Sequence, residues 1–216
     1  MKNDLVKTLG LSPTIPRLYG GGFFLSRLLR FAQVACGISV IVFICQQYFD
    51  LLVFDKTAVT QGEYWRLLSG HFTHSSFSHA FWDIVAFSAS LVWLATYSAR
   101  VIIPAVVAGV LLVNILLLST WSPINYYCGL SGILFSPLIA AAYLHAKHHK
   151  NIIGMMPLLL IVIKLIADLI TQETVFVNTQ WQAYPESHLM GAVAGLFVVG
   201  VIERLNTLTA RITVKY

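Results

Sequence analysis

The sequence predicts an all-α membrane protein with six transmembrane helices and with both termini in the cytoplasm. Of its 216 residues, 57% are hydrophobic and 11% are charged, and the mean hydropathy is +0.76. A soluble domain of this composition would lack the polar side chains that cover a water-exposed surface. Several uncharged runs approach the roughly 20 residues that cross a bilayer, which leads to the same class.

The uncharged runs place the helices in order along the chain. The first run begins after an arginine-rich segment, and the run 101–146 is long enough for two helices separated by a polar break. The fifth helix requires that Lys164 and Asp168 lie inside it. The expected spans are 31–49, 78–98, 101–119, 129–146, 152–170 and 187–204.

Basic residues alternate between the two sides of this arrangement. They dominate residues 1–30, and they recur as Arg100 after the second span, Lys147 and Lys150 after the fourth, and Arg204 after the sixth. Because Lys and Arg are enriched in cytoplasmic segments, both termini are expected inside the cell. The net charge of +5 is therefore a topology signal, and we expect no nucleic-acid partner.

The chain is expected to form one membrane domain. This domain covers residues 26–206. Residues 1–25, which contain several Gly and Pro, are expected to be a cytoplasmic lead-in, and residues 207–216 a cytoplasmic tail.

Two loops on the non-cytoplasmic side are rich in aromatic residues. The loop after the first span contains Trp65 next to Arg66, a pair that suits anchoring at the membrane interface. The loop before the sixth span contains Phe176, Trp181 and Tyr184, which could cover a site below it.

A nucleophile candidate stands at the start of the fourth span. Ser131 lies between Gly129 and Gly132, and the first turn of a helix offers unpaired backbone N–H groups. Such groups can stabilise the oxyanion that forms during acyl transfer. A serine in a glycine-rich patch also occurs simply because small residues let helices approach closely, so the motif alone decides little.

A base candidate stands at the start of the sixth span. An ionisable residue such as His188 is costly inside a membrane and is typical of function. Gly191 and Gly195 form a small face that could bring the sixth span against the fourth, and hence the imidazole to Ser131. Phe135, one turn after Ser131, could stack on the imidazole.

Further polar residues leave more than one interpretation. His71, His74, His79 and Asp83 could supply oxyanion donors or, less naturally, metal ligands. Lys164 and Asp168, four residues apart, fit an ion pair better than a proton relay. The basic cluster in residues 145–150 fits contact with lipid head groups.

These motifs resemble the rhomboid family of intramembrane serine proteases over roughly residues 50–205. The resemblance implies a six-helix rhomboid-like bundle and a catalytic dyad that needs neither a third carboxylate nor a metal or other cofactor. The motifs that carry it are Trp65-Arg66, His74 with His79-x-x-x-Asp83, Gly129-x-Ser131-Gly132 and His188-x-x-Gly191-x-x-x-Gly195.

The resemblance also implies a role for each residue. Ser131 would be the nucleophile, His188 the general base and then acid, and His79 with the Ser131 backbone N–H the oxyanion donors. The family usually has Asn where this chain has Asp83. A protonated Asp could donate to an oxyanion whereas an ionised one could only accept, so the role of Asp83 stays open.

Within the family, the segment 62–71 and Asp83 are most similar to rhombosortases. These are bacterial inner-membrane members that act on a carboxy-terminal Gly-Gly-containing sorting helix of exported proteins. The resemblance implies a multi-pass protein whose active site faces the periplasm and whose partners are the lipid bilayer and a transmembrane substrate.

Two other function classes fit parts of the sequence. A non-catalytic rhomboid-like protein that binds transmembrane segments would share the fold, but such relatives typically lose the Ser or the His. A transporter could use Lys164 and Asp168 as a coupling site, although the sequence has no visible repeat or paired broken helices.

Overall fold

The computed structural model describes residues 21–173, 181 and 183–213. Six long helices dominate these residues, and five of them (α8 is the exception) are long and apolar enough to cross a membrane, which confirms the expected class of an α-helical membrane protein. The long helices are α2 (Gly21–Gln47), α6 (Phe77–Ala95), α7 (Ile102–Leu118), α8 (Ser131–His149), α9 (Ile152–Thr171) and α10 (Pro185–Thr213). The short elements are α3 (Phe49–Leu52), β1 (Phe54–Asp55), α4 (Lys56–Thr60), α5 (Arg66–Ser69), η1 (Gly70–Phe72), η2 (Ala99–Val101) and β2 (Tyr126–Tyr127).

The outer ends of the first and last helices differ from the sequence-based boundaries. Helix α2 begins at Gly21, so the end of the expected lead-in is helical, and α10 continues to Thr213, through most of the expected tail. Charged residues ended the uncharged runs, but they do not end the helices. Arg and Glu are good helix formers, and a long Arg side chain can place its head group at the membrane interface while its stem stays apolar.

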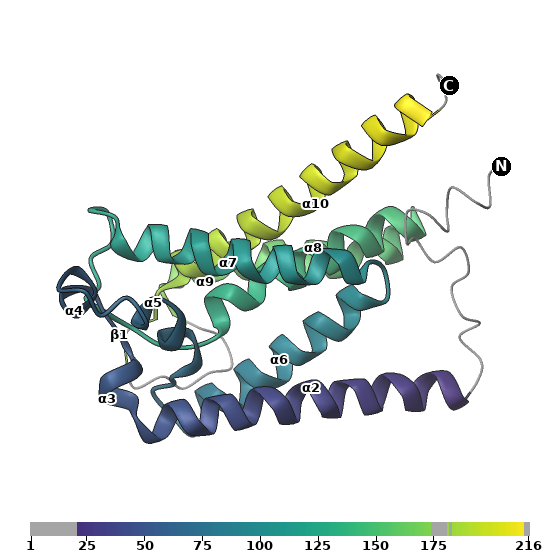
Figure 1. The fold of residues 1–216 in the computed structure, drawn as a ribbon. Helices are drawn as coiled ribbons and strands as arrows, with labels where there is room; N and C mark the ends of the chain where they lie inside the picture. Colours follow the sequence, from purple (N-terminus) through teal and green to yellow (C-terminus); the bar gives the residue numbers. More distant parts are fainter. Residues whose placement is uncertain (1–20, 174–180, 182, 214–216) are drawn as a thin grey trace.

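Helix α8 lies at the centre of the bundle and contacts α6, α7, α9 and α10. Its residues from Gly132 to Pro137 are all buried, and small side chains such as Ala140 and Ala141 let the neighbouring helices approach it closely. Helix α2 instead packs mainly on α6 and keeps most of its surface exposed. Figure 1 shows that α2 begins and α10 ends at one end of the bundle, whereas α3, α4, α5 and β1 gather at the other.

The segment between α2 and α6 is ordered by a buried arginine. Arg66 is only 6% exposed, so its side chain is not the exposed interface anchor that the sequence suggested. Its Nη1 donates to the carbonyl oxygens of Asp50 (2.9 Å) and Val53 (2.7 Å), and its Nε donates to Glu63 Oε2 (2.6 Å). The forked guanidinium satisfies loop carbonyls that burial removes from water, which explains why it turns inward.

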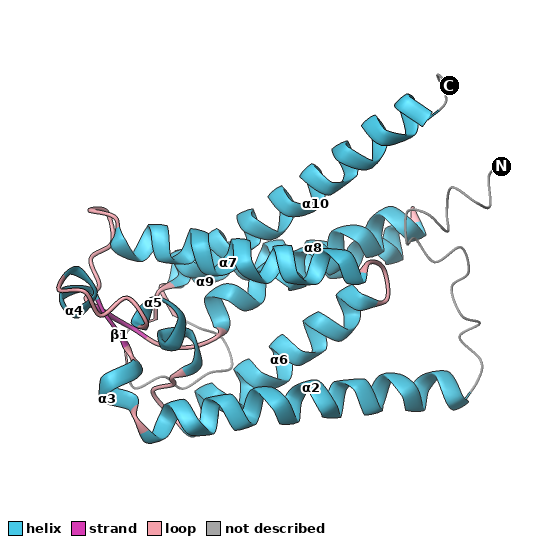
Figure 2. Cartoon of the chain, in the orientation of Figure 1, coloured by secondary structure: helices cyan, strands magenta, loops and turns pink. Residues whose placement is uncertain are grey.

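The same segment is joined to the approach to α8. Strand β1, drawn in magenta in Figure 2, pairs antiparallel with β2, so that Phe54 lies opposite Tyr127. Beyond β2, the Gly129 N–H donates to the Gly70 carbonyl oxygen at 3.2 Å. The loop after α2 therefore fixes the backbone that leads into Ser131.

Replacing Arg66 with Met is expected to lower the stability of the protein by about 2–4 kcal/mol. The change leaves the buried Val53 carbonyl oxygen and the partly buried Asp50 carbonyl oxygen without this donor, and a buried group left unpaired costs roughly 1–3 kcal/mol. The thermal unfolding midpoint in detergent measures the effect. Glu63→Gln is the matched control: it removes the charge of a partly exposed partner yet keeps an acceptor, so a loss as large as that of Arg66→Met would contradict this role.

Candidate active site

Ser131 is the first residue of α8, and a glycine two residues earlier allows the turn that places it there. Gly129 has a φ of +114°, which an L side chain rarely adopts. A Cβ atom at this position would also lie 2.6 Å from His79 Nε2. Gly129 therefore serves both the turn and the close approach of α6 to the start of α8.

The first two backbone N–H groups of α8 have side-chain partners in this structure. The Ser131 N–H donates to Asp83 Oδ2 at 3.0 Å, and the Gly132 N–H donates to the Tyr127 hydroxyl at 3.2 Å. Burial raises the pKa of the Tyr127 hydroxyl, so this group stays protonated at neutral pH. To accept hydrogen bonds from these two N–H groups, an oxyanion would have to replace Asp83 Oδ2 and the Tyr127 hydroxyl.

Asp83 has several polar neighbours around one oxygen. Its Oδ2 accepts from the Ser131 N–H and lies 3.3 Å from the Nε2 atoms of both His74 and His79. The side chain is only 4% exposed, and a buried carboxylate is stable when such partners surround it. In this arrangement Asp83 acts as an acceptor.

His71, the remaining histidine of the first loop, is separate from that cluster. It lies in η1, its ring is 5.6 Å from that of Tyr127, and its Nε2 is 3.4 Å from the Asn114 side-chain nitrogen. Burial lowers the pKa of His71 to about 4, so the ring is neutral at pH 7. Within residues 21–173, 181 and 183–213, no three His, Cys, Asp or Glu side chains are arranged to hold a metal ion.

His188 lies in the first turn of α10 and is 4% exposed. Its ring stacks on that of Phe135, with centroids 4.7 Å apart and an interplanar angle of 22°. Its Nδ1 lies 3.1 Å from Asp168 Oδ2 on α9. The imidazole is therefore held both by its face and by one of its nitrogen atoms.

Gly191 and Gly195 bring α10 against α8. A Cβ atom at Gly191 would collide with the carbonyl oxygen of Gly132, and one at Gly195 would collide with that of Ser136. Only glycine permits this backbone-to-backbone contact. It sets the distance between the helix that carries Ser131 and the helix that carries His188.

Ser131 and His188 line one small cavity, together with His79. Its volume of about 40 Å³ exceeds the space that one water molecule needs. Trp181 and Tyr184, from the loop that was expected to cover the site, also line it, whereas Phe176 lies outside the described residues. The cavity thus contains a hydroxyl, an imidazole and room for water.

Sequence reasoning missed Tyr127, whose hydroxyl caps the Gly132 N–H, and it did not anticipate that Asp168 contacts His188. The spacing of Lys164 and Asp168 predicted their ion pair, which forms with 2.6 Å between Nζ and Oδ2. Nothing in that spacing indicated a third partner on another helix.

Asp83→Leu is expected to destabilise the protein by about 3–5 kcal/mol, because it leaves the Ser131 N–H without its acceptor and removes the carboxylate that lies 3.3 Å from two buried histidines. Asp83→Asn is the matched variant, since its amide keeps one acceptor oxygen, and about 1–2 kcal/mol is expected. The thermal unfolding midpoint in detergent compares the two. An equal or smaller loss for Leu than for Asn would contradict the acceptor role.

Residues 61–204 match the family described as Rhomboid domain. Comparison with curated proteins and with solved structures gave no match. Because the family match spans more than half of the chain, the protein belongs to the rhomboid family, whose members are generally intramembrane serine proteases.

Proposed function

We propose that this protein is an intramembrane serine endopeptidase that uses Ser131 as nucleophile and His188 as general base. The observation that carries the proposal is that both side chains line the same cavity, where Phe135 stacks on the imidazole. A nucleophile, a base and a group that orients the base are the parts that acyl transfer requires. Family membership supports the same reaction.

The reaction proceeds through an acyl-enzyme. His188 Nε2 takes the proton of the Ser131 hydroxyl while Oγ bonds to the scissile carbonyl carbon. The tetrahedral intermediate collapses, its C–N bond breaks, and His188 gives the proton to the departing amine. Water then attacks the ester with the same base, which releases a carboxylic acid and restores the Ser131 hydroxyl.

The developing oxyanion takes donors that Asp83 holds in the resting protein. Both His79 Nε2 and the Ser131 N–H now face Asp83 Oδ2. A substrate carbonyl that enters the cavity replaces Asp83 as their acceptor when its oxygen becomes negative. Asp83 keeps the donors in place between reactions and does not itself donate.

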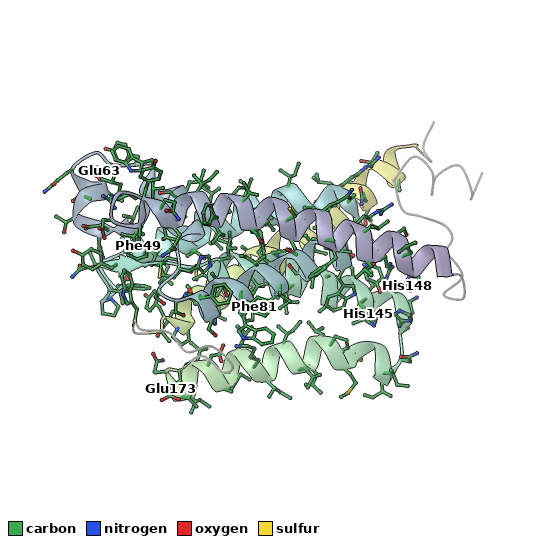
Figure 3. The ribbon with its side chains drawn as sticks, turned by 90° about the horizontal axis from the view of Figure 1, so that it is seen from below. Phe49, Glu63, Phe81, His145, His148 and Glu173 are labelled. Atoms are coloured by element: carbon green, nitrogen blue, oxygen red, sulfur yellow. The ribbon has the colours of Figure 1, made fainter. Side chains whose placement is uncertain are left out.

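The active site opens on the non-cytoplasmic face of the membrane. Arg30 near the start of α2, Lys147 at the end of α8 and Arg204 in α10 favour a cytoplasmic location for that end of the bundle. Figure 3 shows Glu63 and Glu173 toward the opposite end, away from His145 and His148. In a bacterial inner membrane this opposite face is the periplasm.

The substrate is a transmembrane segment that small or helix-breaking residues unwind near its periplasmic end. Among rhomboid subfamilies we favour the rhombosortases, on the strength of the segment 62–71 and Asp83. A carboxy-terminal Gly-Gly sorting segment of an exported protein would then be cleaved. Glycines suit this role because they form helices poorly. The segment therefore unwinds at little cost, and its backbone becomes accessible to the nucleophile.

Cleavage of a single-span reporter in proteoliposomes tests the proposed function. The reporter carries a Gly-Gly pair before its transmembrane helix, and its partner version carries Leu-Leu there. We expect the wild type to cleave the Gly-Gly reporter faster and Ser131→Ala to cleave neither. Binding of the reporter without cleavage by the folded wild type would support a non-catalytic binding protein instead.

A further inference from the structure

A carboxylate and a cation lie behind the proposed base, on the side of His188 that belongs to α9. Asp168 Oδ2 is 3.1 Å from His188 Nδ1 and 2.6 Å from Lys164 Nζ. Asp168 has no exposed surface, whereas 35% of the Lys164 side chain is exposed. An ionisable residue within a membrane span is costly unless paired, so an arrangement that aims its carboxylate at an imidazole calls for an explanation.

This contact determines which nitrogen of His188 can act as a base. An ionised carboxylate only accepts hydrogen bonds, so the nitrogen that faces Asp168 must carry the proton. Nε2 is then the atom with the free lone pair. Phe135 restrains the imidazole further, because its ring stacks on that of His188. Lys164 Nζ lies 5.5 Å from the centre of the same Phe135 ring.

We infer that Asp168 is a positioning residue of the protease: it holds His188 in the tautomer that accepts the Ser131 proton and stabilises the imidazolium that forms, while Lys164 moderates its charge. This inference rests on the proposed function. It adds a carboxylate and a cation to the two residues that the family resemblance implies.

An ion pair with a purely structural role would differ in a measurable way. Removing either partner would then damage the protein in the same sense. Under the inference the two partners act oppositely on His188, because Asp168 favours the protonated imidazole and Lys164 disfavours it.

Other titratable groups also lie near His188. Those that line the cavity are His79 from α6, Tyr126 and Tyr127 from β2, Cys128 and Tyr184, and Glu186 lies on α10 itself.

The pH dependence of labelling by a fluorophosphonate probe separates the two roles. The rate requires neutral His188, so it falls on the acid side as His188 becomes protonated. Asp168→Asn is expected to lower the maximal rate at least tenfold and to move the acid midpoint to lower pH. Lys164→Gln is expected to move the midpoint to higher pH.

Two further variants keep the test decisive. Lys147→Gln removes a mostly exposed lysine paired with Glu203, far from His188, and should leave the profile unchanged. The double variant Lys164→Gln/Asp168→Asn leaves no unpaired buried charge and is expected to keep the reduced rate of Asp168→Asn. Its unfolding midpoint reports whether it folds.

The outcomes distinguish this inference from the proposed function. Labelling of Ser131 in the wild type, with midpoints that do not move in opposite directions in the two single variants, overturns the role of Asp168 and leaves the protease intact. Absence of labelling at Ser131 in the folded wild type overturns both.

Discussion

Replacing Ser131 with Ala, His188 with Ala, or both together is expected to reduce reporter cleavage by the same large factor, on the order of 10⁴–10⁶-fold. Nucleophile and base act as one unit, so removing the second partner costs little once the first is gone. The equality of the three losses is therefore more informative than their size. Initial cleavage rates in proteoliposomes measure all three variants.

Matched substitutions elsewhere in the chain control for nonspecific damage. Ser39→Ala removes an exposed hydroxyl on α2. His148→Ala removes an exposed imidazole near the end of α8, and Figure 3 shows it at the end of the bundle away from Glu63. Both are expected to keep cleavage within about twofold, since exposed surface substitutions usually change little. Losses in Ser131→Ala and His188→Ala that multiply in the double variant would argue against a shared chemical step.

Replacing Gly191 with Ala is expected to reduce cleavage at least 100-fold and to destabilise the protein by about 1–3 kcal/mol. The new methyl group meets the Gly132 carbonyl oxygen, which belongs to the backbone of α8 and cannot swing aside. Helix α10 must move outward, and His188 moves with it. A displacement near 1 Å can cost about 100-fold in rate.

Gly200→Ala is the matched control for this prediction, because it lies farther along the same helix. A Cβ atom at Gly200 would meet nothing within 4 Å. Ala is a better helix former than Gly, so stability is expected to stay equal or rise by up to about 1 kcal/mol. Cleavage rate and unfolding midpoint are measured for both variants, and equal behaviour of Gly191→Ala and Gly200→Ala would refute the close-contact argument.

The sequence contained most of the information about the helices. The apolar runs coincide with the six long helices of the described residues, and five of these are long and apolar enough to cross a membrane. A helix in lipid must satisfy its backbone internally and cover itself with apolar side chains. The spacing of Ser131 to Phe135, and of His188 to Gly191 and Gly195, likewise anticipated which faces meet. These are relations within a single helix, which a periodic pattern expresses directly.

Relations between distant segments were not accessible in the same way. Asp168 on α9 contacts His188 on α10. Arg66 turns inward to carbonyl groups of a loop whose path the sequence does not reveal. The Arg66 error shows the reason. An arginine beside a tryptophan suits either an interface or a buried network, and only the position of unsatisfied backbone oxygens decides between them.

The most direct test of the central claim is to react the purified wild-type protein with a fluorophosphonate and to locate the adduct by peptide mass spectrometry. In this reaction Ser131 Oγ bonds to phosphorus, fluoride departs, and His188 takes the hydroxyl proton. The account predicts an adduct on Ser131 that disappears in His188→Ala. An adduct on another residue, or labelling of Ser131 that is unchanged without His188, would contradict it.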